Sequence, residues 1–455
     1  MLVDIFLNIA DAIREKLNYS NKIIPLNFIE EIDKIDTYNK PIRGTIDIKC
    51  RGIGEVEGLE SGIDTGDPNS INTTKSFVAG GNTSKYGCVV YQPYSHTVTS
   101  TSKVYQYNVY STIVYGWDEK LTKISSQSFT HSNGNPSTCS SEDYMLIIGG
   151  FDYIDAGAST GYNGYYNRTS KVSAINNDFT VTYPSEYIAV EGVATTTIGN
   201  SSVGYYMMIT GGYRTSARIY GDYYNNIIPA ANSTCVAYNS SLTKSTDITP
   251  ITAARMGIGS TTVNDVALFF GGYYASNGRL INNKTWSYGP YIDSYSYIDA
   301  YDKSLTKLDN LVLSGARGQV LAGNIGEYAI CAGGVAHTYT NNWQIDQTYF
   351  RNVDIIDKAL TTSLASQLSQ DNYAGTRIRF TSGSGAYADN NTIFYFANNF
   401  RHNIQDNNNV YFYSDYYDDN LTKTIYSNNN LGRYFLTNID NYFIGSDNKI
   451  YKLES

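Results

Sequence analysis

The stretch LFFGGYY, residues 268–274, runs from an apolar segment into two glycines and then into two tyrosines. A short apolar run that stops at a turn residue is typical of a buried β-strand. Two glycines at the end of a strand let a neighbouring backbone come close, because glycine has no Cβ. The stretch therefore predicts a buried strand whose far end packs tightly against another part of the fold.

Strands of this type recur along the chain. Successive glycine pairs are 60 to 69 residues apart, and their second glycines are Gly81, Gly150, Gly212, Gly272 and Gly334. Two shorter copies lie at 393–399 and 442–446. A regular period of this length predicts a repeat architecture rather than a set of unrelated domains.

Two further signatures keep the same order within the repeats. The first, YDKSLTK at 301–307, predicts a hairpin in which an Asx-type turn joins two strands. Its apolar turn residue recurs at Leu121, Phe179, Leu242, Leu305, Leu360 and Leu421. The second is an arginine that precedes a strand of small residues, at Arg255, Arg317, Arg377 and Arg433. A repeat with these parts contains four expected strands, as a propeller blade does.

The repeat resembles the kelch family, whose marks are the apolar-Gly-Gly strand, the Tyr-Asp turn and the leading arginine. The match spans residues 71–455 and is best at 255–308. It departs from the family in its longer period and in Leu-Thr where the family has a tryptophan. The resemblance implies an all-β, kelch-like β-propeller, with seven blades favoured and six possible.

The last repeat offers only three strands. Its expected strands lie in RYFLTNI (433–439), NYFIGS (441–446) and KIYKLES (449–455). A ring with an open blade would leave strand edges unpaired. We therefore expect a fourth strand from the N-terminal side, at GTIDIKC (44–50), to close the ring.

The first 37 residues have a different pattern and predict a short α-helical hairpin that serves as a docking module. The apolar faces of the two expected helices contain Leu2, Ile5, Ile9, Ile13, Leu17, Phe28 and Ile32. Helices of this size cannot bury a core alone, so they need a partner. Residues 38–70 are rich in Gly, Asp and Ser and predict a linker.

Part of this hairpin resembles a known module. Residues 9–16 (IADAIREK) and 22–25 (KIIP) are similar to a short N-terminal module of tail proteins from phages that infect Gram-positive bacteria. The resemblance implies docking to other tail proteins. The alternative is a capping helix that covers one edge of the propeller.

Composition excludes several function classes. Only 16% of the 455 residues are charged and the net charge is −9, whereas nucleic acids and anionic membranes attract basic patches. The sequence has no apolar run of about 18 residues, so no membrane-spanning segment is expected. Asp4 interrupts the apolar N-terminus, which argues against a signal peptide. The cysteines are widely spaced, which indicates free thiols in a reducing cytoplasm: Cys50, Cys88, Cys139, Cys235 and Cys331.

The connections that follow the glycine pairs are long and rich in Tyr, Asn, Ser and Gly, and in a blade they all leave on one face. Antibody loops use the same composition, and aromatic rings also contact sugars and anchor protein interfaces. The candidate receptor-binding residues are Tyr153, Tyr165, Tyr166, Tyr223, Tyr224, Tyr273, Tyr274, Trp286, Tyr288, Trp343 and Tyr349. Two alternatives stay open: these side chains pack the connections on one another, or an AT-rich genome raises the content of Tyr and Asn.

Enzymatic patterns are weak, so no catalytic residue, metal or cofactor is expected. The four histidines have no metal-ligand spacing: His96, His131, His337 and His402. An arginine triad of the sialidase type would need Arg255, Arg317 and Arg377, but these share one repeat position at which the kelch family has a structural arginine. Asp415, Asp418 and Asp419 lie in an expected turn, where solvation is favoured over a calcium site.

These patterns together predict a tail-fibre or baseplate protein of a phage or of a phage-tail-like particle, made in the bacterial cytoplasm and assembled into the virion. Its N-terminal helices would bind other tail proteins, or further copies of the chain. Its loop-rich face would bind a protein or polysaccharide of the host surface. The alternatives are a purely structural tail propeller, and a secreted glycan-binding adhesin or glycan-active enzyme.

Overall fold

The computed structural model describes residues 51–55, 75–98, 105–109, 112–120, 122–125, 129–131, 136–154, 162–188, 192–212, 217–220, 231–276, 280–281, 285–286, 291–308, 311–339, 345–368, 386–389, 392–398, 412–418, 420–427, 435–439, 442–445 and 449–452. Every regular element in the described residues is a β-strand, in agreement with the expected all-β class. The predicted N-terminal helical hairpin lies outside these residues. No helix long and apolar enough to cross a membrane occurs in the described ranges. Residues Gly52–Lys452 form one compact unit.

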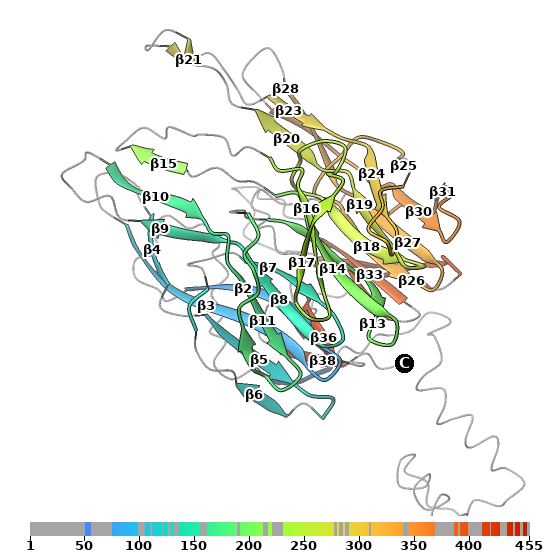
Figure 1. Cartoon of the computed structure of the whole chain (residues 1–455). Helices are drawn as coiled ribbons and strands as arrows, with labels where there is room; N and C mark the ends of the chain where they lie inside the picture. Colours follow the sequence, from blue (N-terminus) through green and yellow to red (C-terminus); the bar gives the residue numbers. More distant parts are fainter. Residues whose placement is uncertain are drawn as a thin grey trace, which may run out of the picture. The chain divides into compact units, whose positions relative to one another are not determined.

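Seven sheets of four or five strands occur among the described residues (Figure 1). We number them along the chain from sheet 1, whose first strand is β2, to sheet 7, whose first strand is taken as β36. Sheet 1 has β2 (Lys75–Asn82), β3 (Gly87–Val98), β5 (Ile113–Trp117) and β6 (Lys123–Ser125), with β4 (Tyr105–Val109) also paired to β3. Sheet 2 has β7 (Ser137–Ser140), β8 (Tyr144–Ile148), β11 (Val172–Asn176) and β12 (Val181–Thr182). Sheet 3 has β13 (Ala194–Asn200), β14 (Gly204–Thr210), β16 (Cys235–Asn239) and β17 (Lys244–Ile248).

The other four sheets follow the same order. Sheet 4 has β18 (Gly259–Val263), β19 (Val266–Phe270), β24 (Tyr297–Tyr301) and β25 (Leu311–Val312). Sheet 5 has β26 (Leu321–Ile325), β27 (Tyr328–Ala332), β30 (Val353–Asp357) and β31 (Thr362–Leu364). Sheet 6 has β32 (Ala386–Asp389), β33 (Thr392–Asn398), β34 (Phe412–Asp418) and β35 (Lys423–Ser427). Sheet 7 has β36 (Phe435–Ile439), β37 (Tyr442–Gly445), β38 (Lys449–Lys452) and, beside β38, β1 (Arg51–Glu55).

The fourth strand of sheet 7 thus comes from the N-terminal side of the chain. The stretch expected in this place, 44–50, lies outside the described residues, and β1 begins immediately after it. Four-stranded antiparallel sheets of this kind, one per sequence repeat, are consistent with a propeller-like fold.

The first strands of successive sheets contact one another, with β2, β7, β13, β18, β26 and β32 in contact in that order and β36 against β2. Side-chain hydroxyls link four of these strands. Thr138 Oγ1 donates to Gly80 O at 2.5 Å, Thr195 Oγ1 to Thr138 O at 2.6 Å, and Ser260 Oγ to Thr195 O at 2.8 Å. The small, hydroxyl-bearing residues of these strands therefore join sheets that share no backbone ladder.

The core lies between the sheets, and this explains the continuous apolar runs. In β19, Ala267 and Phe269 pack in the cluster shared with sheet 3. The alternate residues Leu268 and Phe270 pack in the cluster shared with sheet 5. Because both faces of the strand are covered, both sets of side chains are apolar, as in strands buried on two sides.

The predicted Asx-type hairpin turns are present in five repeats. In sheet 4, Asp302 Oδ1 accepts hydrogen bonds from Ser304 N and Thr306 N, both at 2.9 Å. Asp118, Asn176, Asn239 and Asp357 accept the equivalent pairs of backbone bonds. The apolar turn residue has positive φ, 61° at Leu305, and its side chain packs against the cluster shared with the preceding sheet. Packing between sheets thus offsets the strain of a leucine whose backbone is in the left-handed region.

The tyrosine before this turn and the lysine after it bind the preceding connection. Tyr301 Oη donates to Thr249 O at 2.8 Å, and Lys307 Nζ donates to the next carbonyl, Pro250 O, at 3.0 Å. The equivalent pairs are Tyr238 with Lys244, which bind Ser185 O and Glu186 O, and Tyr417 with Lys423, which bind Ser366 O and Gln367 O. We name this pair the Tyr–Lys clamp.

Candidate functional site

The glycine pair of sheet 4 places the end of β19 against the next repeat. Gly271 and Gly272 have φ of 56° and 110°. A Cβ on Gly271 would lie 2.2 Å from Arg317 O, and Gly272 N donates to the same carbonyl at 2.9 Å. The close approach predicted from the sequence is therefore present at this pair, at the point from which the long connection after β19 leaves.

The long connections that follow the second strands contain strands of their own, which we call the crown (Figure 1). A three-stranded sheet has the order β15 (Ala217–Tyr220), β10 (Tyr162–Arg168) and β9 (Phe151–Ile154). Three hairpins are β20 (Tyr273–Ser276) with β23 (Tyr291–Ser294), β21 (Leu280–Ile281) with β22 (Thr285–Trp286), and β28 (Val335–Tyr339) with β29 (Ile345–Tyr349). Because every connection follows a second strand, the antiparallel topology puts all of them at the same end of their sheets.

Crown strands from different repeats join one another. β15 belongs to the connection of sheet 3 but pairs with β10, which belongs to the connection of sheet 2. β4 of sheet 1 contacts β9, and β23 contacts β28 of the next repeat. No local sequence pattern indicates this pairing across repeats, because the composition of the connections predicts separate loops.

The structure places some of the predicted receptor-binding residues on crown strands. Tyr153 and Tyr166 lie directly opposite each other on β9 and β10, with Tyr165 next to Tyr166. Tyr274 and Tyr349 are half-buried on β20 and β29, and Trp286 lies on β22. The remaining predicted positions fall outside the described residues: Tyr223, Tyr224, Tyr288, Trp343 and the docking residues Leu2, Ile5, Ile9, Ile13, Leu17, Phe28 and Ile32.

Tyr273 differs from its predicted role as an exposed contact residue. Its side chain is only 9% exposed, and burial raises the pKa of its hydroxyl to about 12 despite a hydrogen bond with Gln319. A Cβ on Gly257 or Gly318 would lie 2.7 or 2.6 Å from its ring. Tyr273 therefore packs at the foot of its hairpin, between two repeats, and is poorly placed to touch a partner.

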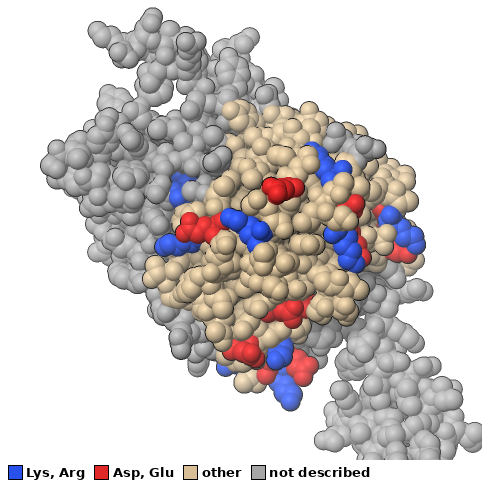
Figure 2. Space-filling model, in the orientation of Figure 1, with Lys and Arg blue, Asp and Glu red and all other residues tan. Residues whose placement is uncertain are grey.

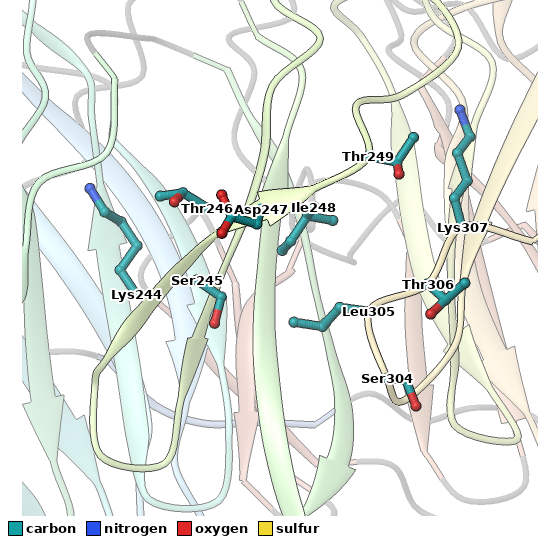
Figure 3. Close-up of a pocket in the computed structure, with 10 residues that line it drawn as sticks. All are labelled: Lys244, Ser245, Thr246, Asp247, Ile248, Thr249, Ser304, Leu305, Thr306 and Lys307. Carbon is teal, nitrogen blue, oxygen red and sulfur yellow. The ribbon is translucent and has the colours of Figure 1, made fainter.

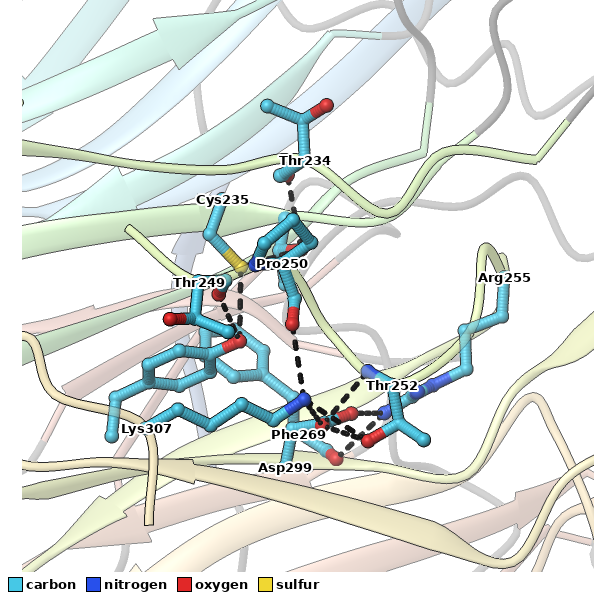
Figure 4. Close-up of polar contacts among 11 residues, drawn as sticks. Thr234, Cys235, Thr249, Pro250, Thr252, Arg255, Phe269, Asp299 and Lys307 are labelled. Carbon is cyan, nitrogen blue, oxygen red and sulfur yellow. Dashed lines mark hydrogen bonds and ion pairs between the residues drawn. The ribbon is translucent and has the colours of Figure 1, made fainter. Parts of the chain in front are cut away.

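The arginine that leads the first strand is part of a buried polar network (Figure 4). Arg255 and Asp299 are fully buried and form an ion pair through Arg255 Nη2. Lys307 Nζ lies 2.6 Å from Asp299 Oδ1, and Thr252 Oγ1 donates to the same oxygen at 2.6 Å. Burial acts to raise the pKa of Asp299, but the Arg255 charge and the hydrogen bonds from Lys307 and Thr252 outweigh it, so the pKa lies below its usual value.

The same position has equivalent partners in two other repeats. Arg317 pairs with Asp354 and donates from Nε to Gly333 O at 2.7 Å. In sheet 2 the position belongs to His131, which bonds Ser173 Oγ at 2.8 Å and Gly149 O at 3.1 Å. The two described arginines thus have structural partners within their own repeats. Arg377, the third arginine that a triad of the sialidase type would need, lies outside the described residues.

A groove of about 520 Å³ lies between β17 and the Asx turn of sheet 4 (Figure 3). Its walls are mainly polar and include Lys244, Asp247 and Lys307. Both lysines have structural partners, because Lys244 Nζ donates to Glu186 O and Lys307 pairs with Asp299. Both lysines that line the groove therefore make contacts within the fold.

Charges and thiols add no further site among the described residues. No group of three or more His, Cys, Asp or Glu there is placed to hold a metal ion. On the face drawn in Figure 2, charged side chains stand singly or in small groups of both signs. Cys88, Cys139, Cys235 and Cys331 are free and buried, and burial raises the pKa of Cys88 and Cys331 to about 12.

No protein-family model matches the chain, and no curated protein matches it. Among solved structures, the chain is similar to one described as "Structure of YjhT", with a TM-score of 0.45 and 10% sequence identity, over 78% of this chain and 99% of that chain.

Proposed function

We propose that the chain is a tail-fibre or baseplate protein of a phage or of a phage-tail-like particle. In this proposal, residues 1–37 dock it to other tail proteins, and the crown binds the surface of the bacterial host. The docking half rests on the resemblance of residues 9–25 to the tail-protein module. The binding half rests on the crown.

The observation that carries the binding role is the difference between the two ends of the sheets. At one end the connections are tight turns such as Asn264–Asp265, together with the Asx turns. At the other end, connections of about 20 residues form strands that pair across repeats. Long connections held on a rigid scaffold are where binding residues concentrate.

A binding role fits the buried arginines better than catalysis does. An arginine that recognises a substrate carboxylate must be accessible to it, whereas Arg255 and Arg317 are fully buried and paired with aspartates. We therefore propose a protein without catalytic residues or cofactor.

We further propose that the seven sheets are the blades of a closed propeller. Contacts between the first strands, from β2 to β32 and from β36 back to β2, support a ring. In this proposal β1 completes the seventh blade, so that the N-terminal segment and the C-terminal strands close the ring together.

The binding role is tested with the purified full chain and intact host cells. We expect saturable binding, and we expect an excess of free chain to block adsorption of the particle. No binding at any concentration, with adsorption unaffected, would favour a purely structural role in the tail.

The docking role needs a separate test. Charged substitutions on the predicted helical face, Ile9→Asp with Ile13→Asp, should prevent incorporation of the chain into particles. The same variant should bind cells like the wild type, because the substitutions lie far from the crown in the sequence. Normal incorporation of the variant would contradict docking through this face.

A further inference from the structure

The three-stranded crown sheet is built from two separate connections of the chain. β9 and β10 follow the glycine pair of sheet 2, and β15 follows the glycine pair of sheet 3. β9 in turn contacts β4, which belongs to sheet 1. One surface therefore extends over three successive repeats.

The register divides the positions of this sheet between its two faces. Tyr165 lies opposite Ile154 and Arg218, whereas its neighbour Tyr166 lies opposite Tyr153 and Ala217. Positions directly opposite each other share a face, and neighbours along a strand alternate between faces. The pairing continues to Tyr162 opposite Tyr220, after an irregularity at position 163.

The two faces have different compositions. The first, which we call the tyrosine–polar face, carries Ile154 together with Asp152, Tyr162, Tyr165, Asn167, Arg218 and Tyr220. The second carries mainly apolar positions, namely Phe151, Tyr153, Gly164, Tyr166, Ala217 and Ile219, with Arg168. Antiparallel sheets commonly have one apolar face on the fold and one polar face in solvent. In line with this, Nε and Nη1 of Arg168, on the second face, are buried.

We propose that the tyrosine–polar face binds an uncharged saccharide of the host surface. Three tyrosine positions supply flat rings for the apolar faces of sugar rings. Asp152, Asn167 and Arg218 supply planar groups that can accept from or donate to neighbouring hydroxyls. The one acidic and one basic position balance, so the face has no excess charge with which to favour an anionic polymer.

This inference rests on the proposed function and makes it more specific. It names the ligand class, and it selects Tyr165 over Tyr153 and Tyr166, which belong to the other face. It also adds Tyr162 and Tyr220, which composition alone did not single out. Their common feature, a shared face of a sheet made from two connections, becomes visible only in the register.

The test uses the purified full chain and envelope polysaccharide from the host, freed of protein and separated into uncharged and anionic fractions. We expect the uncharged fraction to bind the wild type. Tyr165→Ala should weaken this binding about tenfold or more, as loss of a central aromatic contact does. Tyr165→Phe should keep most of the affinity, because the ring remains. Tyr166→Ala is the matched control, and it should lower the melting temperature while the folded fraction keeps its affinity.

Two results would overturn the inference and leave the proposed function standing. One is a wild-type chain that binds host cells but, of the envelope material, only the anionic polysaccharide or the protein that was removed from it. The other is Tyr165→Ala binding the uncharged fraction as tightly as the wild type does. A chain that binds neither cells nor any fraction would remove both the inference and the proposed function.

Discussion

A single position in the repeat carries a different residue in different sheets, with the same structural task. Arg255 and Arg317 lead the first strands of sheets 4 and 5 and pair with Asp299 and Asp354. In sheet 2, His131 bonds Ser173 instead, without a carboxylate. Burial lowers the pKa of His131 to about 3, so the imidazole is neutral in the folded chain.

The low pKa of His131 predicts a pH dependence of stability. The unfolded chain takes up a proton near pH 6.5 and the folded chain does not, so stability falls as the pH falls from 6.5 towards 3. The slope due to this one group is at most about 1.4 kcal/mol per pH unit. Replacing His131 by Gln should flatten the dependence of the unfolding free energy between pH 6.5 and 4.5, measured by urea denaturation. An unchanged slope would show that His131 titrates normally.

At the scale of elements, the Asx turn and the Tyr–Lys clamp convert a short motif into contacts between repeats. The turn residue supplies backbone hydrogen bonds and places an apolar side chain on the preceding cluster. The clamp binds two successive carbonyls of the preceding connection, at Thr249 and Pro250 in sheet 4. The hairpin of sheet 4 thus stabilises its own sheet and the junction before it.

The Asx turn predicts that two substitutions of Asp302 differ in their effect on the free energy of unfolding. Asp302→Ala removes the acceptor of two backbone N–H groups and should cost about 1–2 kcal/mol. Asp302→Asn should stay close to the wild type, because Asn239 makes the same two bonds in sheet 3. Chemical denaturation measures both differences. Equal loss in the two variants would mean that the charge of Asp302, not its turn, stabilises the hairpin.

The Tyr–Lys clamp predicts that removing the hydroxyl of a clamp tyrosine lowers stability, whereas removing that of an exposed tyrosine does not. Tyr238→Phe removes the hydrogen bond to Ser185 O and should lower the unfolding free energy by about 1 kcal/mol. Tyr183→Phe is the control, because Tyr183 is 64% exposed and should tolerate the change. If thermal unfolding of the two variants is indistinguishable, the clamp adds nothing to stability.

At the scale of the whole molecule, the buried thiols report whether the sheets stay packed together. Cys88, Cys139, Cys235 and Cys331 lie in sheets 1, 2, 3 and 5, all buried. At pH 8 these thiols should not react with a thiol reagent in the native chain, since they are protonated and covered. In denaturant all five cysteines of the chain should react. Rapid labelling of more than one thiol in the native chain would mean that the repeats open freely.

The sequence predicted the repeated part of the fold well and the candidate site only in part. The buried strands, the Asx hairpins and the structural role of Arg255 follow from local patterns, and the structure has them. The pairing of β10 with β15 depends on how two connections about 50 residues apart meet, and no local pattern encodes that. For the same reason the sequence pattern predicts a surface position for Tyr273, whereas its ring is buried beside Gly257 and Gly318.

The central claim, that the crown is the binding surface, is tested most directly by hydrogen–deuterium exchange of the full chain with and without host envelope. We predict slower exchange in the crown strands, above all at Phe151–Ile154, Tyr162–Arg168 and Ala217–Tyr220. Exchange at the opposite end, in turns such as 264–265 and 303–304, should stay unchanged. Protection confined to those turns, or no protection anywhere in the crown, would contradict the claim.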